Sequence, residues 1–167
     1  EHFHFDQNLF DRMPDGHNVY GYLQSEKWFK HIESEIREDF EFKNNIKEPC
    51  QEMIGSVDRP IALHVRRGDY ITNCDNHPPC SKDYYDRALS HFDSDRTVVV
   101  FSDDPAWCNE QFEDDRFLIS EGGDNVADLC MMSLCHDFII ANSSFSWWGS
   151  WLSTNPDKKI IAPNRWF

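Results

Sequence analysis

The sequence has no apolar run near the length of about 18 residues that a membrane-spanning helix takes, and no recognisable secretory leader. Basic residues are also scarce. Sixteen Lys and Arg face thirty Asp and Glu, which gives a net charge of −14. Nucleic-acid binding depends on an extended basic face, so we exclude nucleic acid as a partner and expect no membrane span in this chain.

Two common cofactor motifs are missing as well. The six cysteines form no Cys-x-x-Cys unit, so a zinc or redox site is not expected. Cys74 and Cys80 flank a Pro-Pro loop and could close a disulfide in an oxidising compartment, although the even spread of the cysteines favours free thiols. The nearest approach to a Gly-x-Gly-x-x-Gly fingerprint is Gly122-Gly123, which lacks the third glycine, so no nicotinamide or flavin cofactor is expected. The two glycines predict a break in the secondary structure.

What the chain does contain is a series of short apolar runs that alternate with segments of helical periodicity. The predicted strands cover residues 61–65, 97–101, 117–119, 138–141 and 160–162. The predicted helices cover residues 24–40, a segment capped by Ser81, a segment that Asp104 caps and Pro105 opens, residues 125–135, and a Trp-rich segment capped by Ser143 or Ser144. This order predicts an α/β fold: a Rossmann-like parallel sheet of about five strands, with helices on both faces.

We expect two parts. Residues 1–55 form a helical lead-in, and residues 56–167 form the Rossmann-like domain. Pro49 and residues 55–60 predict a loop before the first strand, and residues 70–80 predict an irregular polar loop.

Polar residues follow the first strand directly. Arg66 and Arg67 stand where this strand opens into a loop, which is where open α/β sheets bind their ligands. Guanidinium groups match phosphate oxygens two at a time, so the pair suggests a diphosphate. In a chain this acidic, two cations at a strand end are better explained by a local anion site than by a general basic surface.

Two further strand ends carry polar groups. Asp103 and Asp104 follow the second strand, and Ser143 and Ser144 stand at a helix amino terminus, where free backbone N–H groups favour a phosphate. Together with the arginines they predict a clamp for a nucleotide diphosphate without a metal. Each element also has an ordinary explanation: a surface ion pair, a helix cap or an N-cap serine.

These motifs resemble those of glycosyltransferase family 11, the α-1,2-fucosyltransferases, in order and spacing and over nearly the whole chain. The segments that carry the resemblance are residues 21–29, His64-Val65-Arg66-Arg67-Gly68-Asp69-Tyr70, Phe101-Ser102-Asp103-Asp104, the Trp-rich residues 142–151 and residues 163–167. The resemblance implies the donor-binding half of a GT-B-type glycosyltransferase, with residues 1–55 similar to the inter-lobe segment.

The resemblance also implies an activity: inverting transfer of L-fucose from GDP-fucose to the 2-hydroxyl of a terminal galactose on a glycan acceptor, with no metal or other cofactor. It implies that Arg66 and Arg67 hold the diphosphate, that His64 contacts the guanosine and Asp128 the guanine, and that Ser143, Ser144 and Phe145 lie against the phosphates and fucose. The expected catalytic residues are Arg66, Arg67 and Asp69. The expected substrate-binding residues are His64, Arg66, Arg67, Asp103, Asp128, Ser143, Ser144 and Phe145.

Asp69 is either the catalytic base or the carboxylate that orients the arginines. The Gly-Gly-Leu-Gly-Asn-Gln turn with which the family normally begins has no counterpart here, so we expect a partial chain. The alternative function is therefore a nucleotide-sugar-binding fragment without independent catalysis. The expected compartment is the cytoplasm, of bacterial or viral type, or the Golgi lumen for a truncated membrane-anchored enzyme.

Three other interpretations compete. Arg67-Gly68-Asp69 is a tripeptide that integrins bind, Asp93-Ser94-Asp95 matches the Asp-x-Asp manganese site of metal-dependent glycosyltransferases, and Asn142-Ser143-Ser144 matches a glycosylation sequon. The first follows a buried strand directly. The second lies in a polar turn, where Ser and Asp are ordinary residues.

Overall fold

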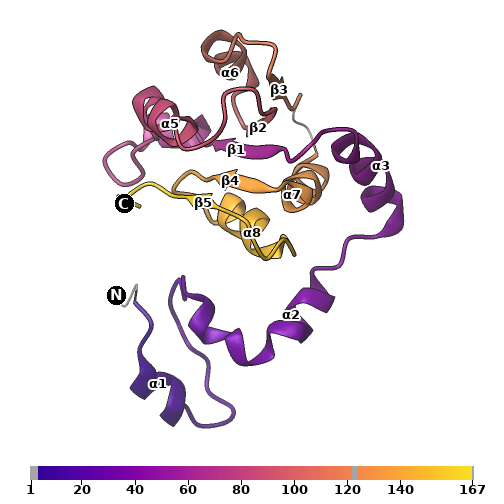
Figure 1. The fold of residues 1–167 in the computed structure, drawn as a ribbon. Coiled ribbons are helices and arrows are strands. Elements are labelled where there is room, and N and C mark those ends of the chain that lie inside the picture. Colours follow the sequence, from indigo (N-terminus) through magenta and orange to yellow (C-terminus); the bar gives the residue numbers. More distant parts are fainter. Residues whose placement is uncertain (1–3, 122–123, 167) are drawn as a thin grey trace. The chain divides into compact units, whose positions relative to one another are not determined.

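The computed structural model describes residues 4–121 and 124–166, so the expected break at Gly122-Gly123 lies outside the described residues (Figure 1). The chain divides into two compact units, Glu1–Glu41 and Phe42–Phe167. None of the helices within these described ranges has the length and apolar composition that a membrane span requires.

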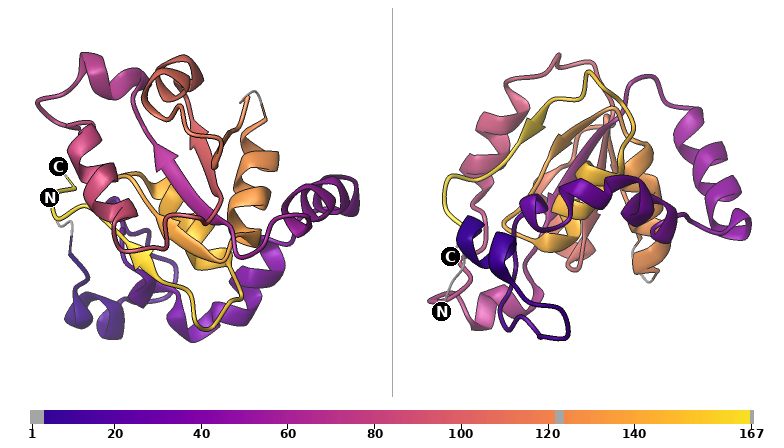
Figure 2. Two further views of the ribbon diagram at one scale, coloured as in Figure 1. Left: turned by 45° about the horizontal axis from the view of Figure 1, so that its top comes forward. Right: turned by 90° about the horizontal axis from the view of Figure 1, so that it is seen from below.

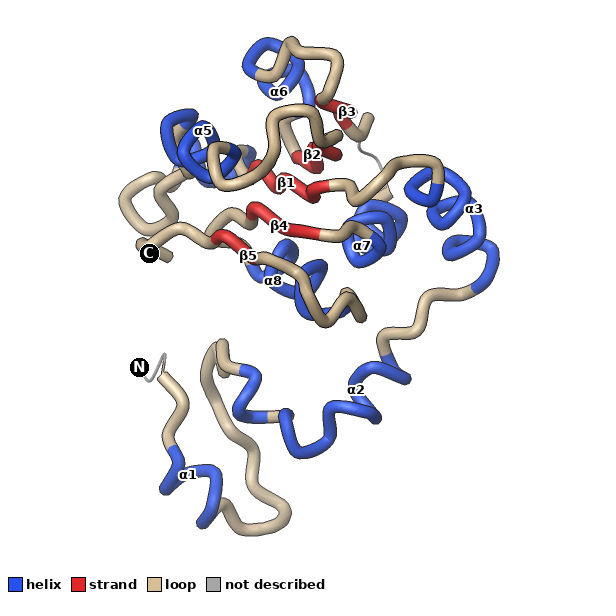
Figure 3. Tube along the Cα trace, in the orientation of Figure 1, coloured by secondary structure: helices blue, strands red, loops and turns tan. Residues whose placement is uncertain are grey.

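The second unit contains a five-stranded parallel sheet in the order β3-β2-β1-β4-β5 (Figure 3). The strands are β1 (Ile61–Val65), β2 (Val98–Ser102), β3 (Phe117–Ile119), β4 (Asp137–Ile139) and β5 (Ile160–Ile161). The chain builds outward from β1 to β3 and then returns to place β4 on the other side of β1. The predicted Rossmann-like α/β fold is confirmed, and its point of reversal lies between β1 and β4, where such sheets bind ligands.

Helices cover both faces of this sheet (Figure 2). They are α3 (Asn44–Gly55), α4 (Gly68–Thr72), α5 (Lys82–Leu89), α6 (Pro105–Gln111), α7 (Asn125–Leu134) and α8 (Ser144–Leu152). Successive side chains of a strand point to opposite faces. Ala62 of β1 therefore packs in a core cluster with α3 and α7, whereas Leu63 packs in a second cluster with α5 and α6.

Local sequence explains where several of these helices begin. Ser81 accepts a hydrogen bond from the backbone N–H of Tyr84 at the start of α5, and Asp104 accepts one from Trp107 at the start of α6. Pro105 occupies the first turn of α6, where its missing N–H costs nothing. The caps predicted at these positions are confirmed.

Other local predictions were wrong. The segment predicted as a loop around Pro49 is α3, because Cys50 and Ile54 follow one another at helical spacing and are buried against α7. The compact second unit therefore begins at Phe42, ahead of the boundary expected between residues 55 and 56. The start of the loop predicted for residues 70–80 is helical, since α4 extends to Thr72.

The first unit is built from short helical pieces. It contains α1 (Gln7–Arg12), two 3-10 turns, η1 (Glu26–Trp28) and η2 (Lys30–Ile32), and α2 (Glu33–Asp39). The single helix predicted for residues 24–40 is thus interrupted at Phe29, whose φ of −132° lies outside the helical region. Edge-to-face contacts join the ring of Trp28 to those of Phe5 and Phe10.

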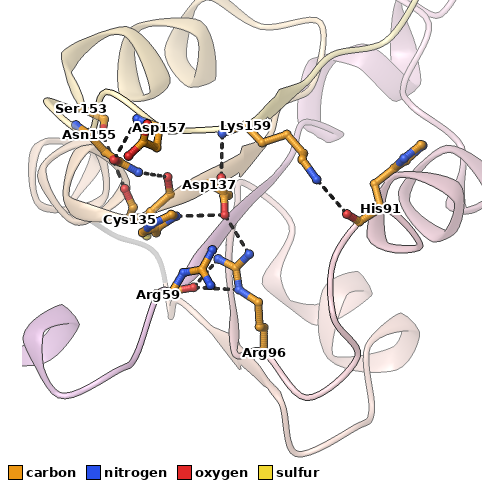
Figure 4. Close-up of polar contacts among 10 residues, drawn as sticks. Arg59, His91, Arg96, Cys135, Asp137, Ser153, Asn155, Asp157 and Lys159 are labelled. Atoms are coloured by element: carbon orange, nitrogen blue, oxygen red, sulfur yellow. Dashed lines mark hydrogen bonds and ion pairs between the residues drawn. The ribbon is translucent and has the colours of Figure 1, made fainter.

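The amino ends of the strands in the second unit are tied together by one buried carboxylate (Figure 4). Asp137, at the start of β4, pairs with the Arg96 guanidinium at 2.8 Å, lies 3.0 Å from Nδ1 of His136 and accepts the backbone N–H of Lys159. Arg96 in turn donates to the carbonyl oxygen of Arg59, just before β1. Burial alone would raise the pKa of Asp137, but these donors outweigh burial and hold it below its usual value. We call these five residues the amino-edge network.

Candidate functional site

A cavity of about 510 Å³ lies at the carboxyl ends of β1 and β2 and the amino ends of α7 and α8. Every residue of its wall belongs to the second unit. The wall consists of His64, Arg66, Asp69, Tyr70, His77, Phe101, Ser102, Asp103, Pro105, Glu121, Asn125, Asp128, Ser143, Ser144 and Phe145.

Arg66 lies in this wall between two carboxylates. Its Nη2 is 2.7 Å from Oδ1 of Asp69, and its Nη1 is 2.8 Å from Oδ2 of Asp103. The guanidinium also lies 5.5 Å from the ring centre of Tyr70, which stacks on His77. The Asp69 side chain is 64% exposed, whereas that of Asp103 is 25% exposed. The pair with Asp69 is therefore the weaker of the two.

Arg67 does not line the cavity. Its Nε is 3.0 Å from Oδ2 of Asp104, and its guanidinium lies 4.2 Å from the ring centre of Trp107. The hydrogen bond from Arg67 holds the pKa of Asp104 below its usual value. Only the backbone N–H of Arg67 turns toward the site, where it donates to Oδ1 of Asp103 at 2.9 Å.

His64 is a buried imidazole in the same wall. It is 5% exposed, its ring lies 5.4 Å from that of Phe145, and its Nδ1 has no hydrogen-bond partner among the described residues. Burial lowers the pKa of His64 to about 3, and the positive charge of Arg66 acts in the same direction. At neutral pH the side chain is therefore an uncharged ring with an unused polar atom.

Asp128 is part of the same cavity wall and belongs to α7. It is 7% exposed and accepts a hydrogen bond of 2.6 Å from the hydroxyl of Ser120. Burial raises the pKa of Asp128, and the bond from Ser120 opposes that rise. A buried carboxylate with one donor has oxygen lone pairs to spare for a further donor in the cavity.

The first turn of α8 completes the wall. Ser143 is its N-cap residue, but the serine side chain makes no capping hydrogen bond. The helix therefore begins after Ser143 as predicted, and the Ser143 side chain leaves the backbone N–H groups of this turn to other partners. The helix dipole adds a partial positive charge at the same place.

The structure thus brings together all but one of the predicted site residues. His64, Arg66, Asp69, Asp103, Asp128, Ser143, Ser144 and Phe145 share one cavity wall, and Arg67 stands apart from it. Sequence reasoning missed Tyr70 and His77, which share the wall with Arg66. Tyr70 is the last residue of the arginine motif, and this position was its only signal in the sequence.

The competing motifs have other surroundings. Asp93 borders a different cavity, beside the amino-edge network and separated from the site by the length of β2, roughly 15 Å. Among the described residues, no three His, Cys, Asp or Glu side chains form a cluster that could hold a metal ion. Asn142 is 2% exposed and its amide donates to two backbone carbonyls, so the sequon is inaccessible to a glycan. Cys74 and Cys80 are free thiols in the structure.

A doubly wound parallel sheet with a polar cavity at the carboxyl ends of its strands defines the Rossmann-like class of α/β domains. The similarity to known proteins is more specific. The model of the family "Glycosyl transferase family 11" matches residues 6–166, so the chain belongs to glycosyltransferase family 11.

Curated relatives and solved structures agree with this assignment. The chain is 30% identical to the O-antigen biosynthesis glycosyltransferase WbnK of Escherichia coli over 99% of its length, and 35% identical to an alpha-1,2-colitosyltransferase of Escherichia coli over 88%. It is 24% identical to human galactoside alpha-(1,2)-fucosyltransferase 1 over 80% of its length. The chain spans 60%, 55% and 42% of these three relatives, respectively.

A crystal structure of POFUT1 in complex with GDP shares the fold of this chain. The TM-score is 0.59 at 13% sequence identity, with 89% of this chain and 63% of that chain covered. The predicted GT-B-type fold is confirmed.

Proposed function

We propose that this protein transfers L-fucose from GDP-fucose to the 2-hydroxyl of a terminal galactose on a glycan, with inversion and without a metal ion. The observation that carries the proposal is one cavity in which a half-exposed arginine, a buried carboxylate and an open helix amino terminus face the same space. A guanine nucleotide diphosphate has groups that complement all three.

Guanine is the base that fits the carboxylate. Asp128 can accept the ring N–H and the exocyclic amine of guanine together, while its other contact, with Ser120, orients the carboxylate. Uracil has no exocyclic amine, so it cannot make the second of these hydrogen bonds. Burial of Asp128 makes an unmet partner costly, which is a source of discrimination between bases.

The diphosphate would lie between Arg66 and the first turn of α8. A guanidinium and a row of backbone N–H groups stabilise the negative charge that grows on GDP as the bond to fucose breaks. In a metal-dependent enzyme a divalent ion supplies this charge. Ser143, Ser144 and Phe145 stand at the same helix start and would contact the phosphates and the sugar.

The ion pair of Arg66 with Asp69 suggests how a base becomes available. The diphosphate competes with Asp69 for the guanidinium, and this exposed pair is the easier one to break. The released carboxylate could take the proton of the acceptor hydroxyl. In that step the acceptor oxygen attacks the anomeric carbon from the face opposite the diphosphate, the bond to GDP breaks, and the proton passes to Asp69.

A second donor deserves a test because of one relative. The chain is 35% identical to a protein named as an alpha-1,2-colitosyltransferase. Colitose differs from fucose in lacking the 3-hydroxyl, so the nucleotide and diphosphate contacts proposed here would serve both donors. A transfer assay with GDP-fucose and GDP-colitose in parallel decides between them.

Calorimetric titration of the chain with GDP-fucose, GDP and UDP tests the proposal. We expect GDP to bind more tightly than UDP, and Asp128→Ala to weaken GDP by about 1–3 kcal/mol while leaving UDP unchanged. Equal affinity for GDP and UDP would contradict the guanine assignment. Binding of GDP-fucose without transfer to a galactoside would favour the alternative, a nucleotide-sugar-binding part of a longer enzyme.

A further inference from the structure

Adjacent arginines at the end of β1 have different surroundings. Arg66 follows His64 in the alternation of the strand and faces the cavity, whereas Arg67 follows Val65 and faces α6. The Arg67 guanidinium is bound to Asp104 and covered by the Trp107 ring, and neither of these partners lines the cavity.

Through Asp104, Arg67 holds the start of α6. The other oxygen of the Asp104 carboxylate caps that helix by accepting the N–H of Trp107, so one carboxylate joins the β1 end to the helix. The ring of Trp107 lies against the arginine from the same helix, and a stacked guanidinium of this kind is poorly replaced by the ammonium of lysine.

We call the contact among Arg67, Asp104 and Trp107 the α6 clamp, and Asp103 connects it to the cavity. Its Oδ1 accepts the backbone N–H of Arg67, and its Oδ2 pairs with Nη1 of Arg66. The backbone at Gly68 packs closely against the Asp103 carboxylate, because a Cβ at Gly68 would lie only 2.6 Å from Oδ2 of Asp103. Any shift of the β1–α4 turn against α6 therefore moves the carboxylate that orients Arg66.

We propose that Arg67 is a positioning residue that never contacts the donor: with Asp104 and Trp107 it locks the β1–α4 turn against α6, so that Asp103 holds Arg66 toward the diphosphate. This inference rests on the proposed function in one respect, namely that Arg66 binds the diphosphate. It replaces the direct phosphate contact that the family resemblance implies for Arg67.

A phosphate-binding role and a positioning role for Arg67 predict opposite changes in GDP affinity for one substitution. Asp104→Asn keeps a side-chain oxygen for the cap of α6 but removes the charge that holds Arg67. If Arg67 were a phosphate ligand, losing this competing carboxylate would release the guanidinium and strengthen GDP binding. If Arg67 is a positioning residue, the same change loosens Arg66 and weakens GDP binding.

The experiment is a calorimetric titration of GDP into the wild-type chain and into Asp104→Asn, Arg67→Lys and Arg66→Lys. We expect the dissociation constant to rise about tenfold for Asp104→Asn and for Arg67→Lys, and more for Arg66→Lys. Asp86→Asn is the matched control, because it also removes one carboxylate charge, from an exposed pair with Lys82 on α5. Its dissociation constant should equal that of the wild type.

Unchanged or tighter GDP binding by Asp104→Asn overturns the positioning role and leaves the proposed function standing. A wild-type chain that binds no GDP overturns the proposed function instead. The positioning role is then judged by nuclear magnetic resonance of the Arg66 side-chain N–H groups, which need no ligand. They should exchange with water faster in Asp104→Asn than in Asp86→Asn, and equal exchange rates would refute the α6 clamp.

Discussion

The charged groups at the two ends of the sheet differ in burial and in how fully they are paired. At the amino end, the buried Asp137 is matched by Arg96, His136 and the backbone of Lys159 within the chain. At the carboxyl end, the ion pair of Arg66 and Asp69 is exposed. Polar groups that find their partners inside the fold stabilise it, whereas groups left half-exposed or unmatched are available to a ligand.

Groups that stabilise the fold and groups available to a ligand therefore lie at opposite ends of the same strands. β1 and β2 each run from the amino-edge network to the cavity, over five residues each. A charge removed at one end should therefore change the free energy of unfolding, and a charge removed at the other should change ligand affinity. The predictions for Asp137 and Asp69 test this division, and the prediction for His64 adds a buried group at the cavity end whose protonation changes stability.

The largest effect is expected for Asp137→Asn. The substitution leaves Arg96, whose side chain is 11% exposed, without its counter-charge, and breaking a buried pair in this way costs about 3–5 kcal/mol. Urea denaturation should show this loss in the free energy of unfolding. The affinity for GDP, measured where the variant is folded, should be that of the wild type. A loss of GDP affinity without a loss of stability would erase the contrast between the two ends.

A smaller effect should follow acidification, through His64. The folded-state pKa of about 3 lies below the unfolded value, so the stabilising contribution of the neutral ring is complete above about pH 6.5 and is lost as the pH falls toward 3. Within this window His64 contributes at most about 1.4 kcal/mol per pH unit to the slope of the unfolding free energy. His64→Gln cannot titrate, so its unfolding free energy should fall less than that of the wild type between pH 7 and pH 5. Parallel curves would show that folding does not lower the pKa of His64.

The substitution Asp69→Asn tests whether Asp69 competes with GDP for Arg66 at the carboxyl end of the sheet. It removes the exposed carboxylate that competes for Arg66, so GDP should bind more tightly, by about 0.5–1 kcal/mol. Transfer to a galactoside acceptor should be lost in the same variant, because the amide cannot accept the proton. Weaker GDP binding would show that Asp69 supports Arg66 rather than competing with the phosphates.

The smallest effect is expected for Asp93→Ala and Asp95→Ala. Both residues lie in the turn before β2, away from the cavity, so transfer and GDP affinity should change by no more than about 0.5 kcal/mol. Activity should also survive excess EDTA, since Arg66 and the start of α8 are proposed to balance the charge of the diphosphate. Manganese dependence that these two substitutions abolish would instead favour the Asp-x-Asp interpretation.

The strands were predictable because their composition leaves little choice. Val98 to Val100 are consecutive β-branched residues buried on both faces of the sheet, and the structure contains each predicted strand with ends that differ by at most two residues. The grouping of Arg66 with Asp103 followed from the same reasoning, because the carboxyl ends of parallel strands lie along one edge.

What the sequence could not supply was orientation and tertiary support. Alternation along β1 implies that only one of two adjacent arginines faces the cavity, but the choice depends on which face α6 covers. The helix α3 was missed because Pro49 argues against a helix locally, while burial of Cys50 and Ile54 on α7 outweighs that preference. The contact between Ser120 and Asp128 joins residues eight positions apart and leaves no pattern to read.

One glycine outside the cavity wall fixes how closely two of the surrounding helices approach each other. A Cβ at Gly149 of α8 would come within 2.2 Å of the Met132 sulfur of α7, so these helices approach as closely as they do only because a methyl group is missing. One turn earlier on α7 lies Asp128, and about one turn earlier on α8 lies Phe145, and both of these residues line the cavity. The distance between these two residues therefore depends on a helix contact that lies outside the cavity. A larger residue at position 149 would push α7 and α8 apart and so change the cavity without altering any residue of its lining.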